Sequence, residues 1–159
     1  IRKLACELPH VHVVEPVPLG GELGYYSGED MPEKSSMMAY SDVFTTVYST
    51  MVVEASVHGR PVVSVCIDSP VGWPGKYTLP LSQIGGWPTH SRFRESGAGK
   101  VALNREQLIQ AINAYLDNPE ADQLARQRFV ERECTFTDGT AGKRTAAILL
   151  SKLGINDAP

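Results

Sequence analysis

A nearly continuous apolar run at residues 62–67 (VVSVCI) constrains the fold more than any other feature of the sequence. A strand with one face in water alternates apolar and polar residues, whereas a strand covered by helices on both faces stays apolar throughout. The run therefore predicts a central strand of a mostly parallel sheet. Runs at 43–47 (VFTTV) and 101–103 predict further strands, and another is expected at 10–15 (HVHVVE) before Pro16.

Helical patterns lie between and after these strands. Asn104 and Gln107 form a capping-box pattern, and Gly59 stands where a helix ends. Leu124, Ala125 and Phe129 are expected to point inward. The predicted helices span residues 31–40, 50–58, 104–118, 119–133 and 140–153. This order of strands and helices predicts an α/β, Rossmann-like fold with helices on both faces of the sheet and C-terminal helices packed on it.

Residues 68–100 contain ten prolines and glycines, which predicts a long loop without extended regular elements. A loop of that length inside a compact domain is uncommon and is usually functional.

The composition fits one soluble globular domain, because 42% of the 159 residues are hydrophobic and 21% are charged. The net charge is −3, whereas a protein that binds the phosphate backbone of a nucleic acid needs a basic surface. Nucleic acid is therefore not an expected partner. No apolar run reaches the roughly 18 residues that span a bilayer, and no signal peptide is recognisable, so a cytoplasmic location is expected. Cys6, Cys66 and Cys134 are far apart and predict reduced thiols.

Ligands of open α/β sheets bind outside the carboxyl ends of the strands. The loops that leave the expected strands contain Gly20, Gly21, Ser49, Thr50 and Asp68. We therefore expect these five residues to gather at one edge of the sheet.

Ser49 and Thr50 stand between a strand and a helix, where backbone N–H groups and hydroxyls favour a phosphate. The alternative is that one of them only caps its helix, since Ser and Thr are common N-caps. Glu54 lies one helical turn later among apolar residues. Its carboxylate either accepts hydrogen bonds from the hydroxyls of a ribose or lies on the solvent side of the helix.

Basic residues cluster at 90–94 (HSRFR), where His90, Arg92 and Arg94 either reach an anionic ligand or are solvated. His10 and His12 would share a face of their expected strand. A metal site would need a third ligand, and none is close in sequence, so no metal is expected.

Two stretches resemble a known family. Residues 39–50 (AYSDVFTTVYST) followed by 54–63 (EASVHGRPVV) resemble the donor-binding, C-terminal half of GT-B fold glycosyltransferases. The segment 137–144 (TDGTAGKR) is similar to the tail of CDP-glycerol glycerophosphotransferases and related surface-polysaccharide transferases. UDP-N-acetylglucosamine 2-epimerases share the architecture, but VYST at 47–50 replaces their Asp-Ser-Gly-Gly turn.

The resemblance implies roles for individual residues. In that family the Ser-Thr turn meets the donor diphosphate, which implies this role for Ser49 and Thr50, and the glutamate binds ribose, which implies this role for Glu54. Gly20 and Gly21 are expected beside the diphosphate. Further loop contacts are expected from Tyr48, Asp68, His90, Arg92 and Arg94. The resemblance implies no metal or cofactor, and it leaves the catalytic residues unidentified.

A complete GT-B enzyme has two Rossmann-like halves, and 159 residues suffice for one. The sequence is therefore expected to be a single nucleotide-sugar-binding domain over 1–159, a fragment that lacks its first strand and helix. The expected donor is a UDP- or CDP-linked sugar, and the expected reaction transfers the sugar, or glycerol phosphate, to a cell-envelope glycan acceptor. The isolated chain is expected to be inactive without the N-terminal acceptor domain of the same polypeptide.

The full-length protein is expected at the inner face of the membrane, through peripheral association. The alternatives are a half domain of a nucleotide-sugar 2-epimerase and a non-catalytic α/β interaction module in which Glu54 is only an exposed helix residue.

Overall fold

The computed structural model of the chain describes residues 2–14, 30–47, 49–68 and 80–155. The chain divides into two compact units, Ile1–Met37 and Met38–Pro159. The first unit contains α1 (Arg2–Glu7) and most of α2 (Asp30–Tyr40). The strand predicted at 10–15 is wrong for its described part, because residues 10–14 form no strand and all are exposed. An alternating Val/His pattern produces a strand only where a neighbouring strand pairs with it.

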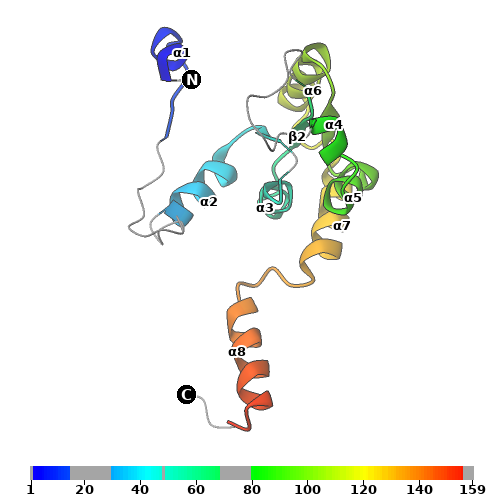
Figure 1. Cartoon of the computed structure of the whole chain (residues 1–159). Coiled ribbons are helices and arrows are strands. Elements are labelled where there is room, and N and C mark those ends of the chain that lie inside the picture. The colour runs from blue at the N-terminus through cyan, green and yellow to red at the C-terminus, as the bar shows by residue number, and fades with distance from the viewer. Residues whose placement is uncertain (1, 15–29, 48, 69–79, 156–159) are drawn as a thin grey trace. The chain divides into compact units, whose positions relative to one another are not determined.

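The second unit is built on a parallel sheet, as predicted. Figure 1 labels its central strand, β2. Its strands are β1 (Phe44–Thr46), β2 (Val62–Val65) and β3 (Lys100–Ala102), in the order β1-β2-β3. Phe44 pairs with Val62, and Val63 pairs with Lys100. The apolar run is therefore the central strand among the described residues.

The two faces of β2 support two different core clusters. Val62 packs in a cluster with Val52 of α3 (Met51–Val57), Phe93 of α5 (Pro88–Ser96) and Phe129 of α7 (Gln123–Cys134). Val63, the next residue, packs in a second cluster with Ala102 and with Ala111 and Tyr115 of α6 (Arg105–Asp117). Successive side chains of a strand point to opposite faces, so helices cover both faces of the sheet.

The predicted end of α3 and the predicted start of α6 are confirmed. Gly59 follows α3 with φ of 71°, a left-handed conformation that glycine adopts without steric cost. Asn104 accepts a hydrogen bond from the Gln107 N–H, and the Gln107 side chain accepts one from the Leu103 N–H, both at 2.8 Å. This reciprocal cap begins α6 directly after β3.

The prediction of a long loop at 68–100 is wrong from residue 81 onward. This region holds α4 (Leu81–Ile84) and α5, and residues 69–79 lie outside the described part. Pro88 occupies the first turn of α5, where its missing N–H costs nothing, and Gly97 ends the helix with φ of 67°. Pro88 and Gly97, two of the ten residues that suggested a loop, are therefore the start and stop signals of a helix.

The inward face of α7 also differs from its prediction. Leu124 is 67% exposed, whereas Arg126 is 1% exposed; Phe129 is buried as predicted. The helix begins at Gln123, after Asp122 in a left-handed conformation, rather than at Pro119. This later start leaves a turn whose carbonyls accept hydrogen bonds from the Arg126 guanidinium, so burying Arg126 satisfies backbone groups as well as filling space.

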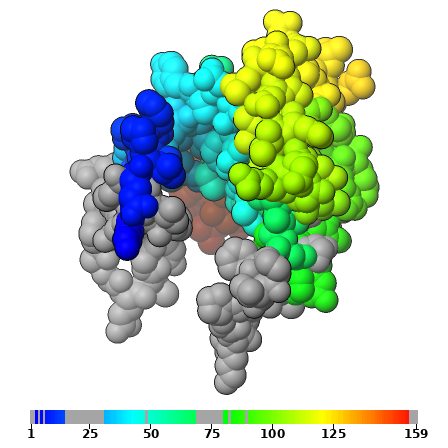
Figure 2. All heavy atoms as spheres, turned by 90° about the horizontal axis from the view of Figure 1, so that it is seen from above, coloured from blue at the N-terminus to red at the C-terminus, as the bar shows by residue number. Residues whose placement is uncertain are grey.

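The helices from α4 to α7 form one contiguous surface, coloured green to orange in Figure 2. Downstream of them, α8 (Ala141–Lys152) has no buried residue. No helix in the described ranges has the length and apolarity needed to cross a membrane.

Candidate functional site

The carboxyl ends of the three strands define the candidate site. Because the strands are parallel, the segments after Thr46, Val65 and Ala102 leave the sheet at one edge. Ser49 and Thr50 follow β1, Asp68 follows β2, and Asn104 follows β3. The structure thus brings three of the predicted site residues to a common edge.

Ser49 and Thr50 differ in what their side chains do. The Ser49 hydroxyl oxygen accepts a hydrogen bond from the Met51 N–H at 3.2 Å, so Ser49 caps the start of α3. Thr50 is exposed and makes no capping hydrogen bond with its side chain. The capping interpretation therefore holds for Ser49. The Met51 N–H is bonded to a side chain rather than to the main chain, so a bound anion could take it over.

Glu54 lies one turn beyond Thr50. Its backbone N–H donates to the Thr50 carbonyl at 3.4 Å, and its side chain is half-buried beside the buried positions Val52 and Ala55. A carboxylate at the first turn of a helix is favoured by the positive end of the helix dipole. Its place one turn beyond Thr50 fits a group that accepts hydrogen bonds from two hydroxyls of a ligand bound at Thr50.

Asp68 already has a structural role. Its carboxylate accepts a hydrogen bond from the Leu81 N–H at 2.5 Å, which fixes the first residue of α4. Two residues earlier, the Cys66 N–H donates to the Ala102 carbonyl at 2.8 Å, so this contact to β3 continues just past the end of β2. Asp68 therefore connects the carboxyl edge of β2 to α4.

His90 lies in the first turn of α5 and is 7% exposed. Burial lowers the pKa of the imidazole, because the charged form is penalised in an apolar environment. At neutral pH His90 is therefore an uncharged group rather than a cation for a phosphate.

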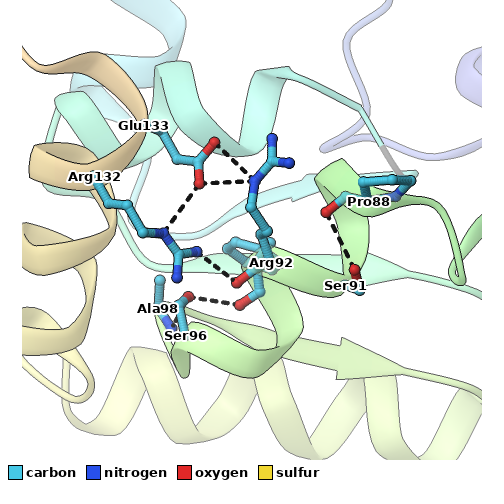
Figure 3. A network of polar contacts seen from close by, with 8 residues as sticks. Pro88, Ser91, Arg92, Ser96, Ala98, Arg132 and Glu133 are labelled. Carbon is cyan, nitrogen blue, oxygen red and sulfur yellow. Dashed lines mark hydrogen bonds and ion pairs between the residues drawn. The ribbon is translucent and has the colours of Figure 1, made fainter.

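Arg92 forms an ion pair with α7 instead of facing the site. Its Nε lies 3.0 Å from one carboxylate oxygen of Glu133 and 3.2 Å from the other (Figure 3). Arg132 also reaches Glu133 and donates to the Arg92 carbonyl. The hydrogen bond from Arg92 is the main reason why the pKa of Glu133 lies below its ordinary value.

Arg94 is exposed in the last turn of α5, and the chain then enters the amino end of β3 at Lys100. The ring of Phe93 approaches Gly99 beside Val62, the first residue of β2. Arg94 therefore lies toward the amino edge, so the predicted basic cluster is not assembled at the carboxyl edge.

Three predicted residues, Gly20, Gly21 and Tyr48, lie outside the described part of the chain. His10 and His12 are exposed in the first unit. Within residues 2–14, 30–47, 49–68 and 80–155, no three His, Cys, Asp or Glu side chains gather in a way that could hold a metal ion.

The start of α6 is a part of this edge that the sequence interpretation did not include. Asn104 and Glu106 open this helix immediately after β3. The signal was present, because a capping box directly after a short strand places a helix N-terminus at the carboxyl edge.

Comparison of the sequence with protein-family models gives no match, and comparisons with curated proteins and with solved structures give none either. Chemically, the edge offers hydroxyl and amide donors at Ser49, Thr50 and Met51 and a carboxylate acceptor at Glu54. This set suits a ligand that carries both an anionic group and neighbouring hydroxyls.

Proposed function

We propose that this chain is the donor-binding domain of a GT-B type transferase and binds a nucleoside-diphosphate sugar. The observation that carries the proposal is the arrangement at the carboxyl edge of a parallel sheet. There Ser49 and Thr50 precede the first turn of α3, and Glu54 follows one turn later. The resemblance of residues 39–63 to the donor-binding half of such enzymes supports the same assignment.

In the proposed complex the diphosphate accepts hydrogen bonds from the Ser49 and Thr50 hydroxyls and from the Met51 N–H. Glu54 accepts hydrogen bonds from the ribose hydroxyls. Donors fixed by the fold would stabilise the negative charge that grows on a departing diphosphate during transfer. UDP- and CDP-linked donors are the proposed ligands. The acceptor and the catalytic base are assigned to another domain, so this chain alone should bind nucleotide without turnover.

Thermal-shift titration with UDP, CDP, GDP and ADP tests the proposal. A ligand at 100 times its Kd adds about 2.7 kcal/mol of stability, which raises Tm by roughly 5–10 °C in a domain of this size. We expect such a shift for UDP or CDP. Flat curves for all four nucleotides at millimolar concentration would contradict the proposal.

Two substitutions locate the site. Glu54→Gln should weaken nucleotide binding about tenfold or more, because hydrogen bonds to a charged group contribute about 1.5–3 kcal/mol. Thr50→Ala should weaken it about fivefold. The controls are Glu95→Gln on α5 and Thr45→Ala on β1, both at exposed positions. Equal affinity of Glu54→Gln and Glu95→Gln would rule out the ribose assignment, and Tm without nucleotide checks that each variant folds.

A further inference from the structure

Strand β3 has an open edge. In the described part of the chain it pairs with β2 alone. The Cys66 N–H donates to the Ala102 carbonyl, so the polar backbone groups of Ala102 face β2. Because these groups point to opposite sides at successive residues of a strand, the N–H and C=O of Val101 face away from β2. The open edge therefore presents a backbone donor and a backbone acceptor.

A groove of about 470 Å³ lies at this edge. Its lining residues come from β3 and from one face of α6: Lys100, Val101, Gln107, Gln110, Ala111 and Ala114. The side chains of Lys100 and Val101 point to opposite faces of the sheet, so a hollow that both residues line lies at the edge of the strand. Since β2 occupies the other edge, the groove lies where a fourth strand would add.

Helix α6 borders the groove as well as the core. Ala111 packs with Val63 and Ala102 in the second core cluster, and it also lines the groove. Ala114, one turn before the end of the helix on the same face, is exposed. The short side chains of these two alanines leave space for larger side chains on an added strand.

The groove suits an uncharged occupant. Of its six lining residues only Lys100 is charged, and its ammonium lies 3.4 Å from the Asp122 carboxylate. The Gln107 side-chain oxygen accepts the Leu103 N–H, so its NH₂ group remains as a donor. Gln110 adds a second, exposed amide. A charged side chain placed here would lose water without gaining an opposite charge.

Residues 10–14 (HVHVV) have the properties of such an occupant. Three of the five are β-branched valines, and the segment contains no Asp, Glu, Lys or Arg. In their own chain these residues form no strand, and Val11, Val13 and Val14 are 45%, 42% and 50% exposed. A strand-forming segment that is left unpaired and exposed is available to the open edge of another chain.

We propose that two copies of this chain associate by strand addition. Residues 10–14 of one copy lie in the groove of the other copy and extend its sheet beside β3. The added backbone exchanges hydrogen bonds with the N–H and C=O of Val101, and a valine side chain lies against Ala111 and Ala114. Main-chain hydrogen bonds give such contacts their affinity, and hollows for alternate side chains give them specificity. Two-fold symmetry repeats the contact in the opposite direction.

Sedimentation velocity of the full chain across micromolar concentrations tests the proposal. We expect a monomer–dimer equilibrium. Val101→Pro should raise the dimer Kd about tenfold or more, because proline lacks the outward N–H while the bonds to β2 remain. Val101→Ala keeps the N–H and should dimerise like the unmodified chain. A chain that stays monomeric, or equal dimerisation of these two variants, would overturn the proposal.

A second pair of variants tests the groove without changing the strand. Ala114→Phe fills the space between α6 and the open edge and should abolish dimerisation. Asn113→Phe is the control, because Asn113 is the adjacent exposed residue and does not line the groove. The same Kd for both phenylalanine variants would show that the groove is not the contact. Tm and far-UV circular dichroism check that each variant folds.

A third experiment identifies the occupant. Val13→Asp places a charge in the groove and should abolish dimerisation, whereas Met31→Asp, at another exposed apolar residue of the first unit, should not. A synthetic peptide of residues 8–14 should convert the dimer to monomer. If Val13→Asp dimerises normally or the peptide does not compete, another segment or surface makes the contact and the proposal is wrong. No nucleotide is present, so failure here leaves the proposed donor site untouched.

Discussion

At the scale of single residues, Tyr115 joins three parts of the second unit. It is fully buried in α6, and its hydroxyl donates to the Asp122 carboxylate at 2.8 Å. Lys100 of β3 reaches the same carboxylate at 3.4 Å, and its ammonium lies 5.0 Å from the Tyr115 ring centre. Burial and the hydrogen bond to Asp122 both raise the pKa of Tyr115, so the phenol stays protonated as a donor.

Removing this hydroxyl should destabilise the domain. We expect Tyr115→Phe to lower the free energy of unfolding by about 1–2 kcal/mol, because a buried hydrogen bond to the Asp122 carboxylate is lost. The loss is modest because that carboxylate keeps Lys100 as a partner and remains partly exposed to water. Tyr40→Phe is the control, since Tyr40 is 85% exposed. Urea unfolding measures both variants, and an equal effect of the two would contradict the role assigned to Tyr115.

Gly99 is required for space rather than for backbone freedom. A Cβ atom there would lie 2.5 Å from the Val62 carbonyl oxygen and 2.5 Å from the Phe93 ring. Gly99→Ala should therefore cost about 1–3 kcal/mol, as overpacking does elsewhere. Gly142→Ala, where a Cβ would meet nothing within 4 Å, should leave the urea midpoint no lower. A midpoint of Gly99→Ala equal to that of the unmodified chain would show that the strand can shift to make room.

At the scale of elements, Asp138 and Arg144 fix the start of α8. The ion pair and the hydrogen bonds from Thr140 lower the pKa of Asp138 to about 2. Because this pKa lies below its unfolded value, the contact stabilises the helix start above about pH 4, and the stabilisation is lost as pH falls toward 2.

The test is an NMR titration of the Asp138 carboxyl group. We expect a midpoint near 2 in the unmodified chain. Arg144→Gln should move the midpoint upward toward the ordinary 3.8, because the largest stabilising contact is removed. Lys143→Gln, which removes a neighbouring cation outside this contact, should leave it in place. A titration that is the same in all three proteins would rule out the ion pair in solution.

The elements show which sequence patterns determine local structure. The central strand at 62–65 and the capped start of α6 were predictable because the apolar run and the Asn-x-x-Gln box are each contained in a few consecutive residues. The start of α7 was not, because Asp122 adopts a left-handed conformation held by contacts to Tyr115 and Lys100 from other elements. Propensity favoured a helix from Pro119, and tertiary contacts moved its start.

Part of the candidate site was likewise predictable from the sequence, and part was not. Ser49, Thr50 and Asp68 were predictable as neighbours of strand ends, because parallel topology alone brings such residues to one edge. The partner of Arg92 was not predictable. Glu133 lies 41 residues away in sequence, and only the packing of α5 against α7 brings the two together.

Within the second unit as a body, β2 couples the two core clusters. Val62 and Val63 are consecutive and fully buried, yet they belong to clusters on opposite faces of the sheet. A change on either face alters the same strand and therefore the pairing with both β1 and β3. The second unit should consequently unfold as one cooperative body rather than as two layers.

Paired substitutions test this coupling. Val62→Ala and Val63→Ala should each cost about 2 kcal/mol, through lost burial and the cavity left behind. Each variant should lower the protection of slowly exchanging amides equally in α3 and in α6, although α3 packs on one face and α6 on the other. Thr45→Ala, at an exposed position of β1, should change neither. If Val63→Ala lowers protection in α6 alone, the two faces unfold separately, and β2 does not transmit the loss across the sheet.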